Sequence, residues 1–227
     1  FPMSVLIETF QSLQRKGLPV LLVLTGLPTL LSKLSEARTY TERMFEVMTL
    51  KSLSEPESID AITKPTMREG CPLQFSPETV NTIVQMSAGY PYFIQFICRE
   101  VYDAWLAKLG TGQVPSVPTT EIARKLDHNF FQSRWNRATD RQKELLMVVA
   151  TLPNCDAEFS VADVVSASKT TLAMGKHFKP SNANLMLAAL VEHELVYKNR
   201  YGRYMLAVPL LSQFILRQAT ESVIRSQ

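Results

Sequence analysis

The chain has 227 residues, of which 46% are hydrophobic and 20% charged, and its formal net charge is +3. These values are typical of a globular protein with one large or two small domains, and the charge is too small to indicate nucleic-acid binding by itself. No apolar run approaches the roughly 20 residues of a membrane-spanning helix. The three cysteines, Cys71, Cys98 and Cys155, are scattered without metal-like spacing, so we expect a cytoplasmic protein with no membrane contact and no metal site.

The first fifty residues predict two helices and two strands. Apolar side chains recur at helical spacing over 2–15 and again over 29–38. Between these helices, residues 20–24 are all apolar, which is typical of a strand buried on both faces of a parallel sheet, and residues 45–50 predict a second strand. Strand, helix and strand in this order form a βαβ unit. A parallel sheet of two strands cannot cover both its faces, so the sheet looks incomplete within this chain.

Thr25 directly follows the first predicted strand. Open parallel sheets bind ligands beyond the carboxyl ends of their strands, so the Thr25 hydroxyl is a candidate site group. A turn that begins at Thr25 explains the same residue without any function, and both interpretations stay open.

Residues 51–112 predict a group of helices. The first helix opens at a capping box of Ser54 and Glu57, and Pro65 should end or kink it at Lys64. A later helix, over 92–109, is expected to turn one apolar face inward.

Residues 113–138 predict a linker with a helix over 119–131, and residues 139–227 predict a separate domain. This domain begins with three helices, of which the first opens at a capping box over 139–142 and the second over 160–163. Two alternating strands over 195–199 and 203–208 then enclose a Tyr-Gly turn, and a helix over 210–224 closes the chain. Three helices, a hairpin and a helix are the order of a winged helix-turn-helix.

Several segments together resemble one family. TGLPTLL, TYTERMFEVMTLKSLSEPES, SAGYPYFIQ, HNFFQSRWNRAT and LVYKNRYGRYMLAVPLL occur in this order. They resemble the C-terminal half of bacterial P-loop ATPases of the AAA+/STAND type, relatives of the origin-recognition ATPases, over essentially the whole chain. The resemblance implies an α/β fold at the start and a mostly α chain overall. Its parts would be a partial P-loop NTPase core (1–50), a helical lid (51–112), a linker helix (113–138) and a winged helix (139–227).

In such ATPases the N-terminal half carries the P-loop and an acidic, Mg²⁺-binding strand. This chain has no G-x-x-x-x-G-K-[ST] and no apolar strand that ends in an acidic pair. The cofactor that the resemblance implies is ATP or ADP with Mg²⁺, and the implied partner is the N-terminal half of the same ATPase. The chain, which starts at Phe1, would be a piece of a longer protein or a remnant, and it would hydrolyse ATP only with that half present.

The resemblance implies catalytic roles for two residues. Thr25 takes the sensor-one position, where a polar side chain reaches the γ-phosphate or the attacking water. Arg43 takes the place of an arginine finger that points at the nucleotide of a neighbouring subunit, which implies a homo-oligomer. The alternative for Arg43 is an ordinary ion pair with Glu42 or Glu46.

Gly89, Tyr90 and Pro91 match the Gly-x-Pro motif of STAND ATPases, whose proline touches the adenine. Helix geometry alone also explains two of them, since glycine ends helices and proline begins them. Relatives in the origin-recognition branch carry a sensor-two arginine on the following helix. Here no arginine occurs before Arg99.

Cations near the third helix of the winged-helix domain predict weak, salt-sensitive binding to duplex DNA. No acidic residue lies between Val164 and Val191, but the helix itself has no Arg or Lys, so little base readout is expected. The alternative is a winged helix that binds protein, in a chain that acts as a non-catalytic interaction module. The candidate DNA contacts are Lys176, Lys179, Asn182, Asn184, Lys198, Arg200 and Arg203.

Overall fold

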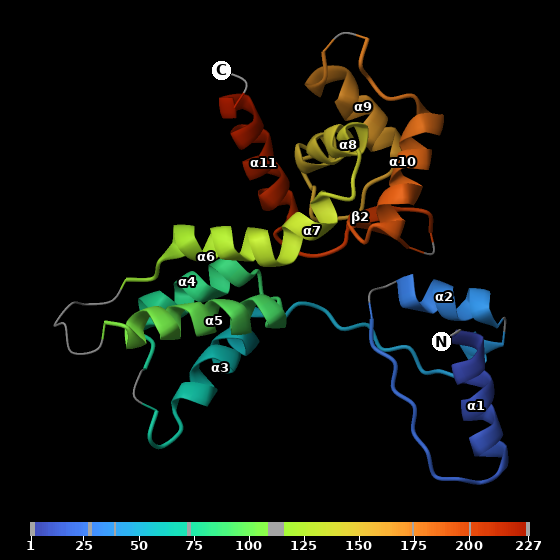
Figure 1. The fold of residues 1–227 in the computed structure, drawn as a ribbon, viewed down its shortest axis with the longest axis horizontal. Coiled ribbons are helices and arrows are strands. Elements are labelled where there is room, and N and C mark those ends of the chain that lie inside the picture. Colours follow the sequence, from blue (N-terminus) through green and yellow to red (C-terminus); the bar gives the residue numbers. More distant parts are fainter. Residues whose placement is uncertain are drawn as a thin grey trace.

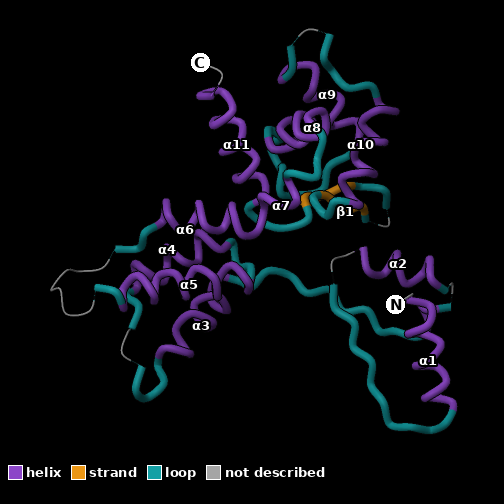
Figure 2. The backbone as a smooth tube through the Cα atoms, in the orientation of Figure 1, coloured by secondary structure: helices purple, strands orange, loops and turns teal. Residues whose placement is uncertain are grey.

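The structure is a computed structural model in which the described parts of the chain are mostly helical, with one two-stranded sheet. Figures 1 and 2 show a small N-terminal unit, a middle group of helices and a C-terminal group that contains the sheet. The described residues are 3–26, 29–38, 40–71, 74–108, 116–173, 175–199 and 201–225.

The N-terminal unit consists of α1 (Met3–Arg15), α2 (Thr29–Ala37) and the 3₁₀ turn η1 (Thr41–Arg43). The two helices form where apolar spacing predicted them, and they pack on each other. They bury Ile7, Phe10 and Leu34. The hydroxyl of the buried Thr41 donates to the carbonyl oxygen of Leu34 over 2.9 Å and so holds the turn against α2.

The two strands predicted in this unit are not formed in the described chain, so this prediction was wrong. Residues 18–26 and 45–54 are connecting segments, and no ladder of backbone hydrogen bonds joins them to any described part of the chain. They are not buried either, since Leu21 is 86% and Leu50 84% exposed. The physical reason is that a strand needs a hydrogen-bonded neighbour, and two strands alone are too few for a stable parallel sheet.

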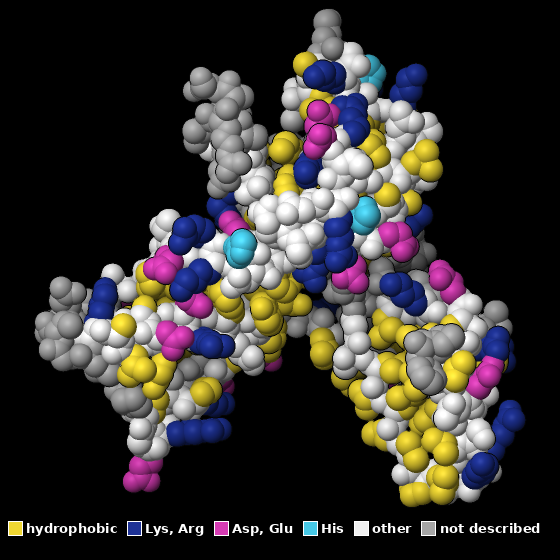
Figure 3. All heavy atoms as spheres, in the orientation of Figure 1, with side chains coloured by type: hydrophobic (Ala, Val, Ile, Leu, Met, Phe, Trp, Pro, Cys, Tyr) yellow, Lys and Arg dark blue, Asp and Glu magenta, His cyan; other side chains and the backbone are white. Residues whose placement is uncertain are grey.

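These two segments leave many apolar side chains on the surface of the N-terminal unit, visible at the lower right of Figure 3. The exposed ones are Leu18, Val20, Leu21, Val23, Val47, Met48 and Leu50.

The middle group contains α3 (Glu55–Thr66), α4 (Pro77–Ser87) and α5 (Pro91–Leu106), which pack on one another. The predicted capping box is present, because Glu57 accepts hydrogen bonds from the backbone N–H and the hydroxyl of Ser54. The predicted end at Lys64 is two residues early, because α3 runs through Pro65 and ends at Thr66. The fixed φ of proline is compatible with a helix, and so close to the helix end its missing N–H removes only one backbone hydrogen bond.

The inward face of α5 is the predicted one. Phe93, Ile97, Val101 and Trp105, spaced by four residues, are all buried.

A continuous helical stretch leads from the middle to the C-terminal group and consists of α6 (Thr119–Leu126), a π-helical turn η2 (Asp127–Phe131) and α7 (Gln132–Trp135). The sequence predicted a helix only as far as Phe131. Lys125 of α6 forms an ion pair with Glu100 of α5 over 2.7 Å, which fixes this stretch to the middle group.

The C-terminal group contains α8 (Asp140–Ala150), α9 (Val161–Thr171), α10 (Pro180–Glu192), β1 (Val196–Lys198), β2 (Tyr204–Leu206) and α11 (Leu211–Arg225). The predicted hairpin is confirmed, with antiparallel register Val196↔Leu206 and Lys198↔Tyr204. An isolated bridge pairs Phe159, just before α9, with Tyr204 and so adds a third short segment beside β2.

One hydrophobic cluster joins the middle and C-terminal groups, and its buried members extend from Ile62 to Ile215. Ile7, Phe10 and Leu34 are buried outside it, so the N-terminal unit has a small core of its own. None of the described helices combines the length and the apolar character needed to cross a bilayer.

Candidate functional site

The Gly89–Pro91 turn between α4 and α5 is bound to the chain that enters α3. The backbone N–H of Leu53 donates to the carbonyl oxygen of Gly89 over 2.8 Å. Gly89 has φ +70°, and a Cβ added there would lie 2.3 Å from the Leu53 carbonyl oxygen. Only glycine fits this position, for reasons of both conformation and space.

This contact brings the beginnings of two helices together. Ser54 caps α3, and Tyr90 occupies the cap position of α5, with Pro91 as the first helical residue. Pro91 is exposed and Tyr90 is half-buried. The surface around the turn is therefore formed by two helix N-termini that a backbone hydrogen bond holds in a fixed relation.

A chain of aromatic rings, which we call the aromatic chain, leads from this turn into the C-terminal group. Tyr90 lies 4.8 Å from Phe93, and Phe93 lies 6.0 Å from Phe131 of η2. Phe131 stacks on Phe214 of α11 at 5.2 Å, and Phe214 meets Trp135 of α7 edge-on at 5.7 Å. These rings therefore connect the turn at Tyr90 to α11 through continuous side-chain packing.

Thr25 and Arg43 lie in the N-terminal unit, away from the Gly89–Pro91 turn. Both are exposed. Arg43 is the last residue of η1, and among the side chains that the structure describes it has no ion-pair partner; the side chain of Glu42 lies outside this description. The structure therefore does not bring the two predicted catalytic residues together with the predicted adenine contacts.

A magnesium nucleotide would need metal ligands and a phosphate-binding loop from the protein. No group of three or more His, Cys, Asp or Glu side chains that could hold a metal occurs in the described ranges. The sequence also has no P-loop to bind the phosphates.

Two of the residues predicted to contact DNA interact instead with other side chains of the C-terminal group. Arg203 forms ion pairs with Asp163 at 3.8 Å and with Glu158 at 4.0 Å. Asn184 accepts a hydrogen bond from the hydroxyl of Tyr204 over 3.0 Å. The positive charge of Arg203 is therefore largely balanced, and the Asn184 carbonyl already has a donor.

The other residues predicted to contact DNA are exposed wherever the structure describes them. Lys176, Lys179 and Asn182 are exposed around the start of α10. Lys198 is exposed on the hairpin, with its ammonium group 5.3 Å from the centre of the Tyr204 ring. Arg200 lies outside the described residues.

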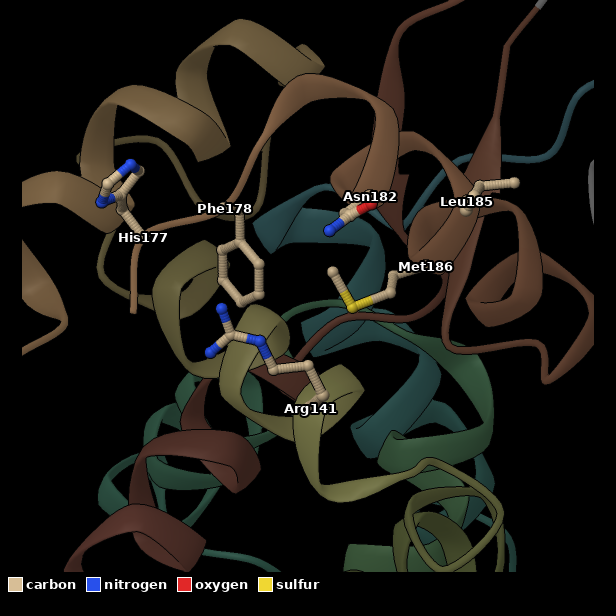
Figure 4. Close-up of a pocket in the computed structure, with 6 residues that line it drawn as sticks. All are labelled: Arg141, His177, Phe178, Asn182, Leu185 and Met186. Atoms are coloured by element: carbon tan, nitrogen blue, oxygen red, sulfur yellow. The ribbon is translucent and has the colours of Figure 1, made fainter. Parts of the chain in front are cut away.

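A pocket of about 230 Å³ lies beside the outer face of α10, and sequence reasoning did not find it. The guanidinium of Arg141 lies 4.1 Å from the centre of the Phe178 ring. In Figure 4, Asn182 and Met186 point from α10 toward this pair, and Leu185 lies on the outer side of the helix. The lining residues are Arg141, His177, Phe178, Asn182, Leu185 and Met186.

Sequence reasoning identified Gly89 but missed Leu53, which contacts it. No local signal reveals the pairing of Leu53 with Gly89, or that of Arg141 with Phe178, because the two partners are far apart in the sequence. These pairs exist only through tertiary packing.

Among the groups whose pKa values are shifted by their surroundings are Asp163, Tyr197 and Cys98. Hydrogen bonds from the backbone and hydroxyl of Ser160, with a weaker contribution from Arg203, lower the pKa of Asp163. Burial, together with the charge of Glu158, raises the pKa of Tyr197. Burial raises the pKa of the Cys98 thiol to about 11. None of the three groups lines the α10 pocket or the Gly89–Pro91 turn.

Residues 128–215 match the profile of a family described as "Domain of unknown function (DUF8462)". The matched span begins in η2 and ends in the first part of α11, so it covers most of the C-terminal group. No curated protein matches the chain.

Proposed function

We propose that this chain is the sensing and output part of an ATP-driven switch protein of the AAA+/STAND type. In this proposal residues 1–50 complete a P-loop core that an N-terminal half supplies. The helices α3 to α5 form the lid, and α8 to α11 with the hairpin form a winged helix that acts as the output domain.

The observation that carries this proposal is the pair of apolar connecting segments, 18–26 and 45–54. Seven of their apolar side chains are exposed, and no ladder of backbone hydrogen bonds pairs the two segments with any other described part of the chain. An exposed apolar surface of this kind is typical of a binding interface, and unpaired strand-like backbone is a template for added strands. Strands of a P-loop core would cover the exposed apolar side chains and would also pair with the backbone groups of the two segments.

The aromatic chain supports the switch part of the proposal. It provides a packed route from the Gly89–Pro91 turn to α11. In the proposed protein, a nucleotide-dependent movement of the turn would reach the output domain along this route. Packed side chains can carry energetic coupling between distant sites when they can adopt two discrete arrangements.

The order of elements supports a winged helix in the C-terminal group. Three helices precede the hairpin, and the bridge from Phe159 to Tyr204 adds the short third segment that borders the wing. Duplex DNA was the expected partner. The ion pairs of Arg203 and the lack of Arg or Lys on α10 favour the second candidate function, a domain that binds protein.

The test is co-expression of the chain with the polypeptide encoded directly upstream of Phe1. We expect a stable complex with a P-loop and ATPase activity, and we expect L21K/V23K to prevent assembly. Leu106→Lys is the matched control, since Leu106 is exposed on α5 and lies outside the two segments. If the upstream polypeptide lacks a P-loop, or if the complex forms equally well with L21K/V23K, the ATPase proposal fails and the interaction module remains.

A further inference from the structure

We infer that the pocket beside α10 docks an acidic, amphipathic segment of a partner protein, which inserts one aliphatic or aromatic side chain. The inference rests on the proposed role of the C-terminal group as an output domain, and it names the kind of partner that this domain binds.

The apolar character of the pocket is the first step. Leu185 is 69% exposed on α10 and lines the pocket together with Met186 and the buried Phe178, so the three side chains form one apolar surface. Met186, one residue on, is half-buried and points toward Phe178 (Figure 4). A volume of about 230 Å³ is sufficient for one large side chain, since apolar cavities of about 150 Å³ already bind benzene.

The charge around the pocket is the second step. The sequence has no acidic residue between Val164 and Val191, whereas Lys176 and Lys179, on either side of the lining residues His177 and Phe178, are both exposed. Of the two acidic residues in the first turns of α8, Glu144 is paired with Arg141 and Asp140 lies 3.7 Å from Lys143. The rim is therefore positive overall, and complementarity calls for a negatively charged partner.

DNA and an acidic peptide are both negatively charged, and α10 distinguishes them. Base readout in a groove needs Arg, Lys, Asn or Gln on the inserted helix. Here Leu185 takes an outward position and Asn184 is bound to Tyr204, so Asn182 is the amide of α10 that remains for such readout. A phosphate backbone gives Leu185 nothing to pack on, whereas an amphipathic helix offers an apolar face for Leu185 and carboxylates for the lysines.

The probe is a fluorescein-labelled synthetic helix with Leu at positions i, i+3, i+4 and i+7 and Asp or Glu elsewhere. Binding to the full chain is measured by fluorescence anisotropy. Two control peptides separate the contributions, one with Ser in place of Leu and one with Lys in place of the acids. We expect both controls to bind about tenfold more weakly or worse, since each removes one of the two complementary features.

Two variants locate the binding site. Leu185→Ser and Lys179→Glu are each expected to weaken the acidic probe about five- to tenfold. Leu216→Ser on α11 and Lys198→Ala on the hairpin are the matched controls, because both side chains are exposed away from the pocket, and they should leave binding unchanged. Leu185 and Lys179 are exposed, so both variants should fold, which circular dichroism verifies.

Three results would overturn the inference. Equal binding of the Ser peptide would leave only charge attraction, and loss of binding in Lys198→Ala but not in Leu185→Ser would move the site to the hairpin. Tight, sequence-selective binding of a DNA duplex that Leu185→Ser does not affect would assign the domain to DNA. Each of these measurements uses the chain alone, so the inference can fail while assembly with the upstream polypeptide still supports the proposed function.

Discussion

Arg217 of α11 donates two hydrogen bonds to Asp127 of η2, from Nε to Oδ2 over 2.8 Å and from Nη2 to Oδ1 over 2.6 Å. The Asp127 side chain is only 15% exposed. The ion pair of Arg217 and Asp127 therefore connects α11 to the π-helical turn, next to the stacked rings of Phe131 and Phe214. Because a two-point guanidinium–carboxylate pair fixes orientation as well as distance, it sets the angle at which α11 leaves the domain.

A double-mutant cycle over Asp127→Ala and Arg217→Ala should give a coupling energy of about 1 kcal/mol in urea unfolding, since Arg217 is only partly exposed and the geometry is two-point. The control cycle uses Arg99 and Asp103, which are 3.7 Å apart and 81% and 60% exposed. Its coupling should be close to zero. Equal couplings in the two cycles would contradict a special role for Arg217.

Gly89→Ala should destabilise the chain by about 2 kcal/mol or more, because the new Cβ meets the Leu53 carbonyl oxygen and the residue is forced into a left-handed conformation. Gly175→Ala is the matched comparison. It has φ +82° with nothing within 4 Å of the added Cβ, so it should cost only about 1 kcal/mol. Similar losses for the two variants in urea unfolding would show that the close contact at Gly89 is relieved without cost.

The capping box of α9 should make part of the stability depend on pH. The pKa of Asp163 is lowered in the folded chain, so its contribution is present above the ordinary carboxyl pKa of about 4 and is lost as the pH falls through the folded value. Asp163→Asn should therefore be less stable at pH 7 by about 0.5–1 kcal/mol, with the difference shrinking toward pH 3. Thermal unfolding at a series of pH values measures this, and a difference that stays constant would contradict it.

Cys98 should be nearly inert toward thiol reagents. With its pKa raised to about 11 by burial, little thiolate exists at neutral pH. In C71S/C155S, the reaction with a disulfide reagent at pH 8 should be about a hundredfold slower in the native chain than in urea. Equal native and unfolded rates would indicate that α5 opens readily around this thiol.

In the assembled ATPase that the proposed function implies, Thr25→Val should lower turnover more than it lowers affinity for ATP. Valine keeps the size of threonine and removes one hydroxyl. The variant should therefore lose one oriented hydrogen bond, which contributes about 1–3 kcal/mol. Thr9→Val in α1 is the matched control, because the Thr9 hydroxyl donates within its own helix to Val5. Turnover and equilibrium nucleotide binding are measured for each variant, and unchanged turnover in Thr25→Val would remove the sensor role.

The helices could be predicted from the sequence wherever their signals are local. The capping boxes that begin at Ser54, Thr139 and Ser160 all form, because their partners lie three residues along the chain. The buried face of α5 follows equally from a period near four residues. The hairpin was found for the same reason, since its two strands are separated only by a short turn.

The candidate site depends on contacts that no local pattern reveals. The strands over 20–24 and 45–50 were expected from composition, but strand formation requires a neighbour and none is described in this chain. The Leu53–Gly89 hydrogen bond and the stacking of Arg141 on Phe178 join residues far apart in sequence. Motif matching found Gly89 but not what occupies the space beside it.

The chain has two tryptophans, and the aromatic chain ends on one of them. Trp135 meets Phe214 at the junction with α11, whereas Trp105 lies at the far end of α5 against Phe75, with ring centres 5.6 Å apart. Each helical group thus contains its own intrinsic fluorophore. With Trp105→Phe and Trp135→Phe as single-tryptophan proteins, emission reports on the C-terminal group and on the middle group separately. A rearrangement that separates Phe131 from Phe214 would change the spectrum of Trp135 while that of Trp105 stays constant.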